Sequence, residues 1–319
     1  MEPFLCGCKA CRSRTWFCRN GIRGRLQLLE GFRPECRRTE CDREHEECQV
    51  KLHDWGAANQ VVFDPSKESF AILRARDPVG EDFKLLGIIF DTKLLMHKGA
   101  RKVATDAGWR LRAILRVRRY FTTPELVRLY KSLVLSFVES GLAGYFHAAT
   151  SVLECVDRVQ QRFLREIGMS ETIALLNFNL APLRTRRDMA ILGMLHRVNL
   201  GETSEQMREL FRPTGVRQIS GDTIGSRTRV ATAFHTKQLL DRVTRSSSDM
   251  FKRSAFGMVQ CYNALPQRVV DEKSVKSFQR ALQNSLKLRA SEGFGGWQDI
   301  FSVGQRYASV LRFQAFFQA

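Results

Sequence analysis

Long apolar runs and acidic residues are both scarce in this sequence. No run of about 18 or more uncharged apolar residues occurs, which excludes a helix that spans a membrane. The first residues show no apolar stretch behind a basic one, so we expect no secretory signal and an intracellular protein. Lys and Arg number 51 against 33 Asp and Glu, a formal net charge of +18. Such an excess favours a polyanionic partner, of which nucleic acid is the commonest.

Cysteine is almost absent after residue 50, because seven of the nine cysteines precede it. The odd total and the missing export signal favour reduced thiols over a disulfide framework. The pair Cys8 and Cys11 has a spacing typical of zinc ligands, and Cys41 with His45 could supply a second pair. The complete spacing of a zinc finger is missing, so a zinc-binding regulator is the last of the alternatives.

Complete catalytic motifs are also missing. The sequence contains no His-Glu-x-x-His, nucleophile elbow, Walker loop or dinucleotide fingerprint, and no adjacent Asp-Asp pair. Asp91, Asp157 and Glu166 stand as single carboxylates. The sequence therefore predicts no metal site and no complete catalytic site.

The periodicity predicts an α+β fold that is mostly α-helical. Residues 1–42 keep no regular apolar period, and a helix is expected from Glu44 to Trp55 with Val50 and Leu52 inward. Three β-like runs follow and predict a small antiparallel sheet. These runs are Val61–Phe63, Ser69–Leu73 and Phe83–Phe90. Beyond residue 100 the pattern is helical, with a linker predicted at 213–230 because of its glycines and proline.

Capping residues and apolar stripes mark the helices of this region. Thr123 is the expected N-cap of one helix, with Pro124 at its first position, and Ser151 and Ser274 are the expected N-caps of two others. A further helix is expected from Thr185 to Val198. The inward stripes are Leu126, Leu129, Tyr130, Leu133 and Phe137; Val152, Cys155, Val156, Val159, Phe163 and Ile167; Ile191, Met194 and Leu195; and Val275, Phe278 and Leu282.

The strongest signal for function is the basic segment 101–131, which holds nine basic residues against two acidic ones. At about 100° per residue, four of its arginines fall within about 60° on a helix, while apolar residues occupy another arc. The four arginines are Arg101, Arg112, Arg116 and Arg119, and the apolar residues are Ala104, Ala107, Leu111 and Leu115. This ridge, with Lys131, predicts binding to a phosphate backbone, and the alternative is an ordinary solvated face.

Three aromatic residues, Trp109, Tyr120 and Phe121, flank the ridge. They are candidates for stacking on bases or, as an alternative, for the core.

Several segments, in this order, resemble non-LTR (LINE-type, jockey-like) retrotransposon reverse transcriptases. Two segments resemble the family's palm and its primer-grip hairpin: Trp55–Asn59 with Phe63–Lys67, and Phe83–Asp91. Others resemble its thumb helices and C-terminal ending: Leu126–Ser132, Leu142–Tyr145, Asp157–Arg165, Tyr262–Val270 and Ser274–Phe278. The resemblance covers about residues 44–290.

The resemblance implies a C-terminal fragment of an RNA-directed DNA polymerase that binds an RNA–DNA hybrid or duplex. It divides the chain into the end of the palm (43–98), a helical thumb (99–212), the linker and a helical C-terminal region (231–319), with 1–42 foreign to the family. Phe83, Leu86, Gly87 and Asp91 would lie near the primer end. Lys67 would lie near the phosphates of the incoming nucleotide.

The intact family uses clustered aspartates that hold two Mg²⁺ ions. Here only Asp42 and Asp54 precede Trp55, so we expect no cofactor and no polymerase activity from this chain alone. Two alternatives stay open: a non-catalytic nucleic-acid-binding protein and a decayed retroelement reading frame. A nuclear location follows from the resemblance alone.

Overall fold

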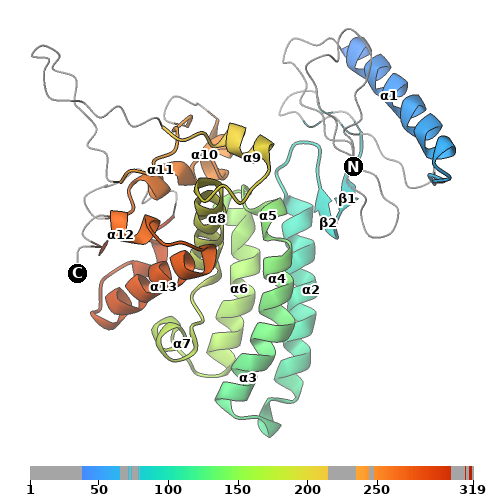
Figure 1. Ribbon diagram of the computed structural model, residues 1–319. Helices are drawn as coiled ribbons and strands as arrows, with labels where there is room; N and C mark the ends of the chain where they lie inside the picture. The colour runs from blue at the N-terminus through green and yellow to red at the C-terminus, as the bar shows by residue number, and fades with distance from the viewer. Residues whose placement is uncertain are drawn as a thin grey trace, which may run out of the picture. The chain divides into compact units, whose positions relative to one another are not determined.

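The computed structural model describes residues 38–64, 71, 73, 78, 80–214, 235–243, 248–302, 313, 316 and 317, with side chains from residue 47 onward. The chain divides into two compact units, residues 1–70 and 71–319. Figure 1 shows the helices and strands of each. The predicted fold class is confirmed, because the described residues form many helices and one small antiparallel sheet. None of the described helices is long and apolar enough to cross a membrane.

The first unit contains helix α1 (Arg38–Ala58), which is longer at both ends than the helix predicted over 44–55. Val50 is 60% exposed, so its predicted inward position is wrong. The predicted strand at Val61–Phe63 is also wrong, since the chain turns back on the helix there. The amide of Val61 donates to the carbonyl of Gly56 over 2.8 Å, and a Cβ atom on Gly56 would lie 2.4 Å from the Phe63 ring.

The second unit begins with a tight hairpin of strands β1 (Phe83–Leu85) and β2 (Ile88–Phe90), paired antiparallel with Phe83 opposite Phe90. The run predicted as one strand therefore turns in its middle, where Leu86 and Gly87 have φ of 49° and 92°. Of the run 69–73, only residues 71 and 73 lie in the described part, and neither is in a strand.

The hairpin packs on the helices through Ile88 and Phe90. Glycine makes this contact possible, because a Cβ on Gly144 would lie 2.8 Å from Ile88 and 3.0 Å from Phe90. A Cβ on Gly99 would lie 2.4 Å from the carbonyl oxygen of Ile89. The hairpin therefore belongs with the helical unit.

Four long helical stretches follow the hairpin. Helix α2 (His97–Arg116) leads through a 3₁₀ turn, η2 (Arg118–Tyr120), into α3 (Thr123–Tyr130). The second stretch begins with α3 and continues through a π-helical turn, η3 (Lys131–Leu135), into α4 (Ser136–Ser140) and α5 (Leu142–Tyr145). Helix α6 (Thr150–Glu166) packs along α2, and α8 (Leu183–Asn199) packs on α6.

The remaining described elements complete the same core. They are α7 (Glu171–Phe178), α9 (Glu205–Leu210), α10 (Asp249–Arg253), α11 (Met258–Asn263), α12 (Gln267–Val270), α13 (Val275–Ser291) and η4 (Trp297–Asp299). One continuous cluster of buried side chains runs from Met96 to Phe317. The predicted thumb and C-terminal segments therefore share one core. Of the predicted linker, only Pro213 and Thr214 are described. Pro213 forms an antiparallel bridge with Leu239, and the Thr214 amide donates to the carbonyl of Gln238 over 2.8 Å.

Three predicted helix details needed correction. The N-cap of α3 is Thr122, one residue before the predicted Thr123, and the Glu125 carboxylate accepts from the Thr122 amide over 2.8 Å. The residue before α6 is Ala149, so Ser151 is not its cap. Leu133 is 44% exposed because the π-helical turn breaks the 3.6-residue period, and Val134 takes the buried position. The predicted cap Ser274 and the buried positions of Phe278 and Leu282 are confirmed.

Two buried histidines join distant segments of this core. His196 on α8 stacks on Phe278 with ring centroids 4.2 Å apart, and its Nε2 donates to the carbonyl of Glu272 over 2.9 Å. His235 donates from Nε2 to the carbonyl of Tyr262 over 3.0 Å. Burial lowers the pKa of both imidazoles below the ordinary value, so both are neutral at neutral pH.

Candidate nucleic-acid interface

Helix α2 carries the predicted basic ridge and is anchored by its opposite face. Ala107 and Leu111 are buried, as predicted, while Ala104 and Leu115 are half-buried. The additional buried residues of this face are Gly99, Ala100, Val103 and Ile114. Because this face packs on the neighbouring helices, the orientation of the arginines on α2 is fixed.

The structure brings together three of the four predicted ridge arginines. Arg101, Arg112 and Arg116 all lie exposed on α2. Arg119 follows the end of the helix in η2, where its guanidinium lies 4.7 Å from the centre of the Tyr120 ring. The predicted common arc therefore ends at Arg116, since a 3₁₀ turn advances about 120° per residue instead of 100°.

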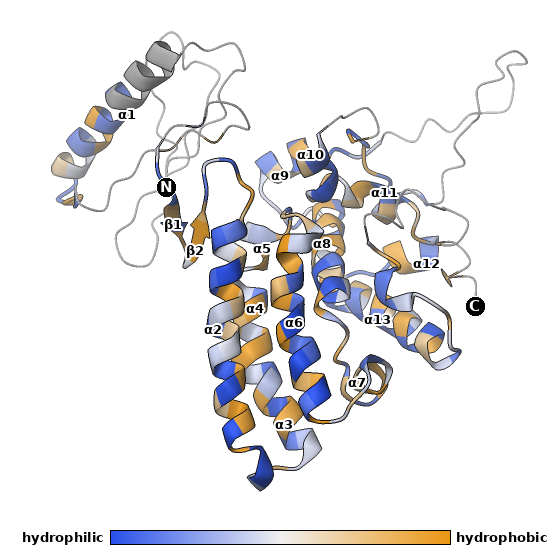
Figure 2. Ribbon diagram, turned by 180° about the vertical axis from the view of Figure 1, so that it is seen from behind, coloured by the Kyte–Doolittle hydropathy of each residue, from blue (hydrophilic) through white to orange (hydrophobic). Residues whose placement is uncertain are grey.

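A groove of about 370 Å³ lies between α2 and α6. From α2 it is lined by Ala104, Thr105, Gly108, Trp109, Leu111 and Arg112, and from α6 by Cys155, Arg158, Val159 and Arg162. Helices α2 and α6 lie side by side in Figure 2, with hydrophilic residues along both. The groove thus joins one predicted arginine of α2, Arg112, to two arginines of α6 that sequence reasoning missed. Their four-residue spacing, which places both on one face of a helix, was the available signal.

Three arginines, Arg112, Arg158 and Arg162, line the groove, while Arg101 and Arg116 lie exposed on α2 outside its lining. Within the described part of the chain, no carboxylate forms an ion pair with any of them. Neighbouring cations differ in this respect: Lys102 pairs with Asp106 at 2.8 Å, and Arg118 pairs with Glu166 at 2.5 Å. The positive charge along the groove is therefore available to a ligand.

Trp109 stands at the groove with 59% of its surface exposed. The guanidinium of Arg112 lies 4.8 Å from the centre of the indole ring. Tyr120 is 68% exposed and Phe121 is 40% exposed, at the end of the same helical pair. The alternative that placed these three aromatics in the core is therefore wrong.

The fifth predicted cation, Lys131, lies away from the groove. Its ammonium donates to the carbonyl of Phe178, the last residue of α7. Burial lowers the pKa of Lys131, and the charges of Arg186 and Lys287 lower it further. In this position Lys131 interacts favourably with the negative end of the α7 dipole. Its role in nucleic-acid binding stays a prediction.

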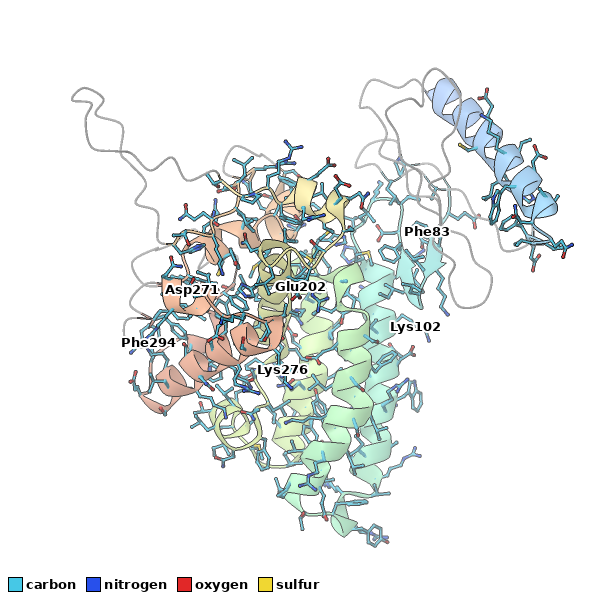
Figure 3. The ribbon with its side chains drawn as sticks, viewed as in Figure 1. Phe83, Lys102, Glu202, Asp271, Lys276 and Phe294 are labelled. Atoms are coloured by element: carbon cyan, nitrogen blue, oxygen red, sulfur yellow. The ribbon has the colours of Figure 1, made fainter. Side chains whose placement is uncertain are left out.

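The residues resembling a primer grip form the hairpin and its exit. The rings of Phe83 and Phe90 stack with centroids 5.5 Å apart, while Leu86 at the turn is 88% exposed. Asp91 has a structural task, because its carboxylate accepts from the amides of Leu95 (2.8 Å) and Met96 (2.6 Å) ahead of α2. Phe83 lies on the hairpin in Figure 3. Lys67 lies outside the described residues.

Potential metal ligands do not gather within the described residues. Among them, no group of three or more His, Cys, Asp or Glu side chains could hold a metal ion. The cysteine and histidine side chains of the zinc alternative, Cys8, Cys11, Cys41 and His45, lie outside the described part.

A second cavity, of about 450 Å³, lies between α6 and α8 and is lined by charges of both signs. In its wall Arg187 forms a two-pronged ion pair with Asp157, whose Nη2–Oδ2 distance is 2.8 Å. The side chains are 7% and 17% exposed. At its edge Arg184 pairs with Asp299 at 3.0 Å, with both side chains far more exposed. Five carboxylates line this cavity against four arginines, one of which is Arg158 of the groove, so the cavity lacks the net positive charge of the groove.

Comparison with known proteins adds no assignment. No protein-family model matches the chain, and no curated protein or solved structure is significantly similar to it. The groove is therefore interpreted from its own chemistry.

Proposed function

We propose that this chain binds the phosphate backbone of nucleic acid through the groove between α2 and α6. The observation that carries the proposal is that three exposed arginines of two helices line one groove, with Arg101 and Arg116 also exposed on α2. Within the described structure none of these five arginines has an ion-pair partner. Arginine suits this task because its planar guanidinium donates several hydrogen bonds to phosphate oxygens and stays charged.

The net charge of +18 supports the same partner. It raises the rate of encounter with a polyanion, whereas the groove fixes where contact is made. Phosphate contacts release counterions, so the logarithm of the binding constant falls by about 0.9 per contact for each tenfold increase in salt. Contacts by the three arginines that line the groove predict a slope of about −2.7 on B-DNA, and further contacts by Arg101 and Arg116 would extend it to about −4.5.

We further propose that the chain is a thumb-containing fragment of a non-LTR retroelement reverse transcriptase. The ordered resemblance supports this origin, and in it the groove lies within the segment that contacts the primer–template duplex. Clustered aspartates for Mg²⁺ are missing both from the expected place before Trp55 and from the described residues. The proposed activity is therefore binding, without nucleotidyl transfer by this chain alone.

The test measures binding of the full chain to a labelled RNA–DNA hybrid by fluorescence anisotropy across a salt series. The test variant replaces three groove arginines: Arg112→Gln, Arg158→Gln and Arg162→Gln. We expect its salt slope to become shallower by about three units, one for each lost contact. Binding should weaken evenly across sequences, because phosphate contacts carry no base information.

A charge-matched control replaces three exposed cations that do not line the groove: Lys273→Gln, Lys276→Gln and Arg280→Gln. Lys276 projects from α13 (Figure 3). We expect this control to retain the slope of the unaltered chain. An equal loss in both variants would show that net charge alone drives binding and would overturn the proposal.

Primer extension with Mg²⁺ on the same samples should give no product. Robust extension would overturn the non-catalytic assignment. No binding at any salt concentration would favour the decayed reading frame.

A further inference from the structure

The groove contains a feature that backbone binding does not use, namely the exposed indole of Trp109. Trp109 is 59% exposed and leaves a large apolar surface in water. A polar residue at this position would serve α2 equally well, so packing of the helix does not require the indole. Trp109 also shares the lining of the groove with Arg112, Arg158 and Arg162. An aromatic ring and several guanidiniums therefore converge on one concave site.

The size of the groove matches a small ligand unit. Its volume of about 370 Å³ lies at the low end of the range found for small-molecule sites. In a duplex the faces of the bases are stacked inside the helix and cannot reach a ring on a protein surface. An unpaired base exposes its face and can stack on an aromatic side chain.

A second ring–guanidinium pair lies at the end of α2. Tyr120 is 68% exposed, and the Arg119 guanidinium lies 4.7 Å from its ring centre, much as Arg112 lies against Trp109. In both pairs the arginine covers part of the ring and brings positive charge beside it. The ring–guanidinium pair of α2 is thus repeated in η2, and two such pairs could accept two bases of one nucleic-acid strand.

We infer that the groove takes an unpaired nucleotide of a single-stranded segment, with its base on Trp109 and its phosphate held by Arg158 and Arg162. Tyr120 offers the stacking surface for a further base of the same strand. This inference rests on the proposed function and adds to it a contact that only single-stranded nucleic acid or a single-stranded overhang can make.

The test compares two substitutions at one position, Trp109→Leu and Trp109→Phe. Leucine is at least as good a helix former as tryptophan, and the side chain is exposed, so α2 should stay folded. We measure affinity of the full chain for an oligothymidine and for a blunt duplex of equal length. For the oligothymidine we expect Trp109→Leu to bind at least about fivefold more weakly. Trp109→Phe should keep most of the affinity, because phenylalanine still stacks.

Fluorescence supplies a second readout of the same contact. Oligothymidine should quench the tryptophan emission of the unaltered chain, and this quenching should be lost in Trp109→Phe. Affinity for the blunt duplex should change less than about twofold in both variants, since no base face is available to the indole.

The outcomes separate this inference from the proposed function. Equal weakening of single strand and duplex by Trp109→Leu would overturn the stacking assignment. Unchanged single-strand binding in Trp109→Leu would also overturn the stacking assignment. If the variant lacking three groove arginines still binds weakly in that case, the proposal of backbone binding stands. If the variant lacking three groove arginines keeps its affinity for both the oligothymidine and the blunt duplex, the proposed function itself is overturned.

Discussion

The buried ion pair between Arg187 and Asp157 gives the sharpest prediction about stability. Burial opposes the charge of Arg187, but the hydrogen bond and the negative charge of Asp157 raise its pKa above the ordinary value. The substitution Asp157→Asn removes that negative charge and leaves the guanidinium buried and still protonated. Breaking one partner of a buried pair costs about 3–5 kcal/mol. The adjoining cavity admits some solvent, so we expect the free energy of unfolding to fall by about 3 kcal/mol.

Urea unfolding followed by tryptophan fluorescence measures this loss. Trp297, which is 4% exposed in η4 beside α8, reports on the same core. The matched control is Asp299→Asn, which breaks the pair with Arg184 by the same chemical change. Its side chains are 43% and 38% exposed, so solvent screens the pair and the expected loss is below about 1 kcal/mol. A loss in Asp157→Asn no larger than in the control would refute the reasoning from burial.

Two further predictions concern pH and the hairpin contact. Because burial lowers the pKa of His196 and His235, the unfolded chain binds protons that the folded chain does not, and stability should decrease as pH falls below about 6.5. A melting temperature that stays constant from about pH 7.5 to about pH 5.5 would contradict this, and His235→Gln should reduce the dependence. Gly99→Ala should lower the melting temperature, since its Cβ would lie 2.4 Å from the Ile89 carbonyl oxygen. Gly108→Ala on the same helix meets no atom within 4 Å and should stabilise by up to about 1 kcal/mol; equal effects of the two alanines would refute the close contact.

Local signals in the sequence predicted the helices well where each helix has one buried face. The stripe from Val152 to Phe163 and the cap at Ser274 were both found, because apolar spacing and capping act within a few residues. The strand predicted at Val61–Phe63 failed for a tertiary reason. Gly56 lets the chain fold closely back on α1, and the β-branched residues there follow that turn.

The candidate site was predictable only in part. The charge of 101–131 indicated α2, but the groove also needs Arg158 and Arg162, which lie more than 40 residues later along the chain. No window within the sequence shows that α6 packs beside α2. Arg119 was misplaced because the switch from α-helix to 3₁₀ turn at η2 leaves no clear mark in the sequence.

The π-helical turn at Lys131–Leu135 has a consequence for comparing this chain with others. A π turn holds about one residue more than an α turn, so the buried faces of α3 and α4 keep their own phases on either side of it. A homologue with one residue fewer in this turn would bury the same positions of α3 and α4 as this chain does. A one-residue gap therefore belongs inside 131–135 in any alignment, whereas a gap elsewhere between Thr123 and Ser140 would turn core positions toward solvent.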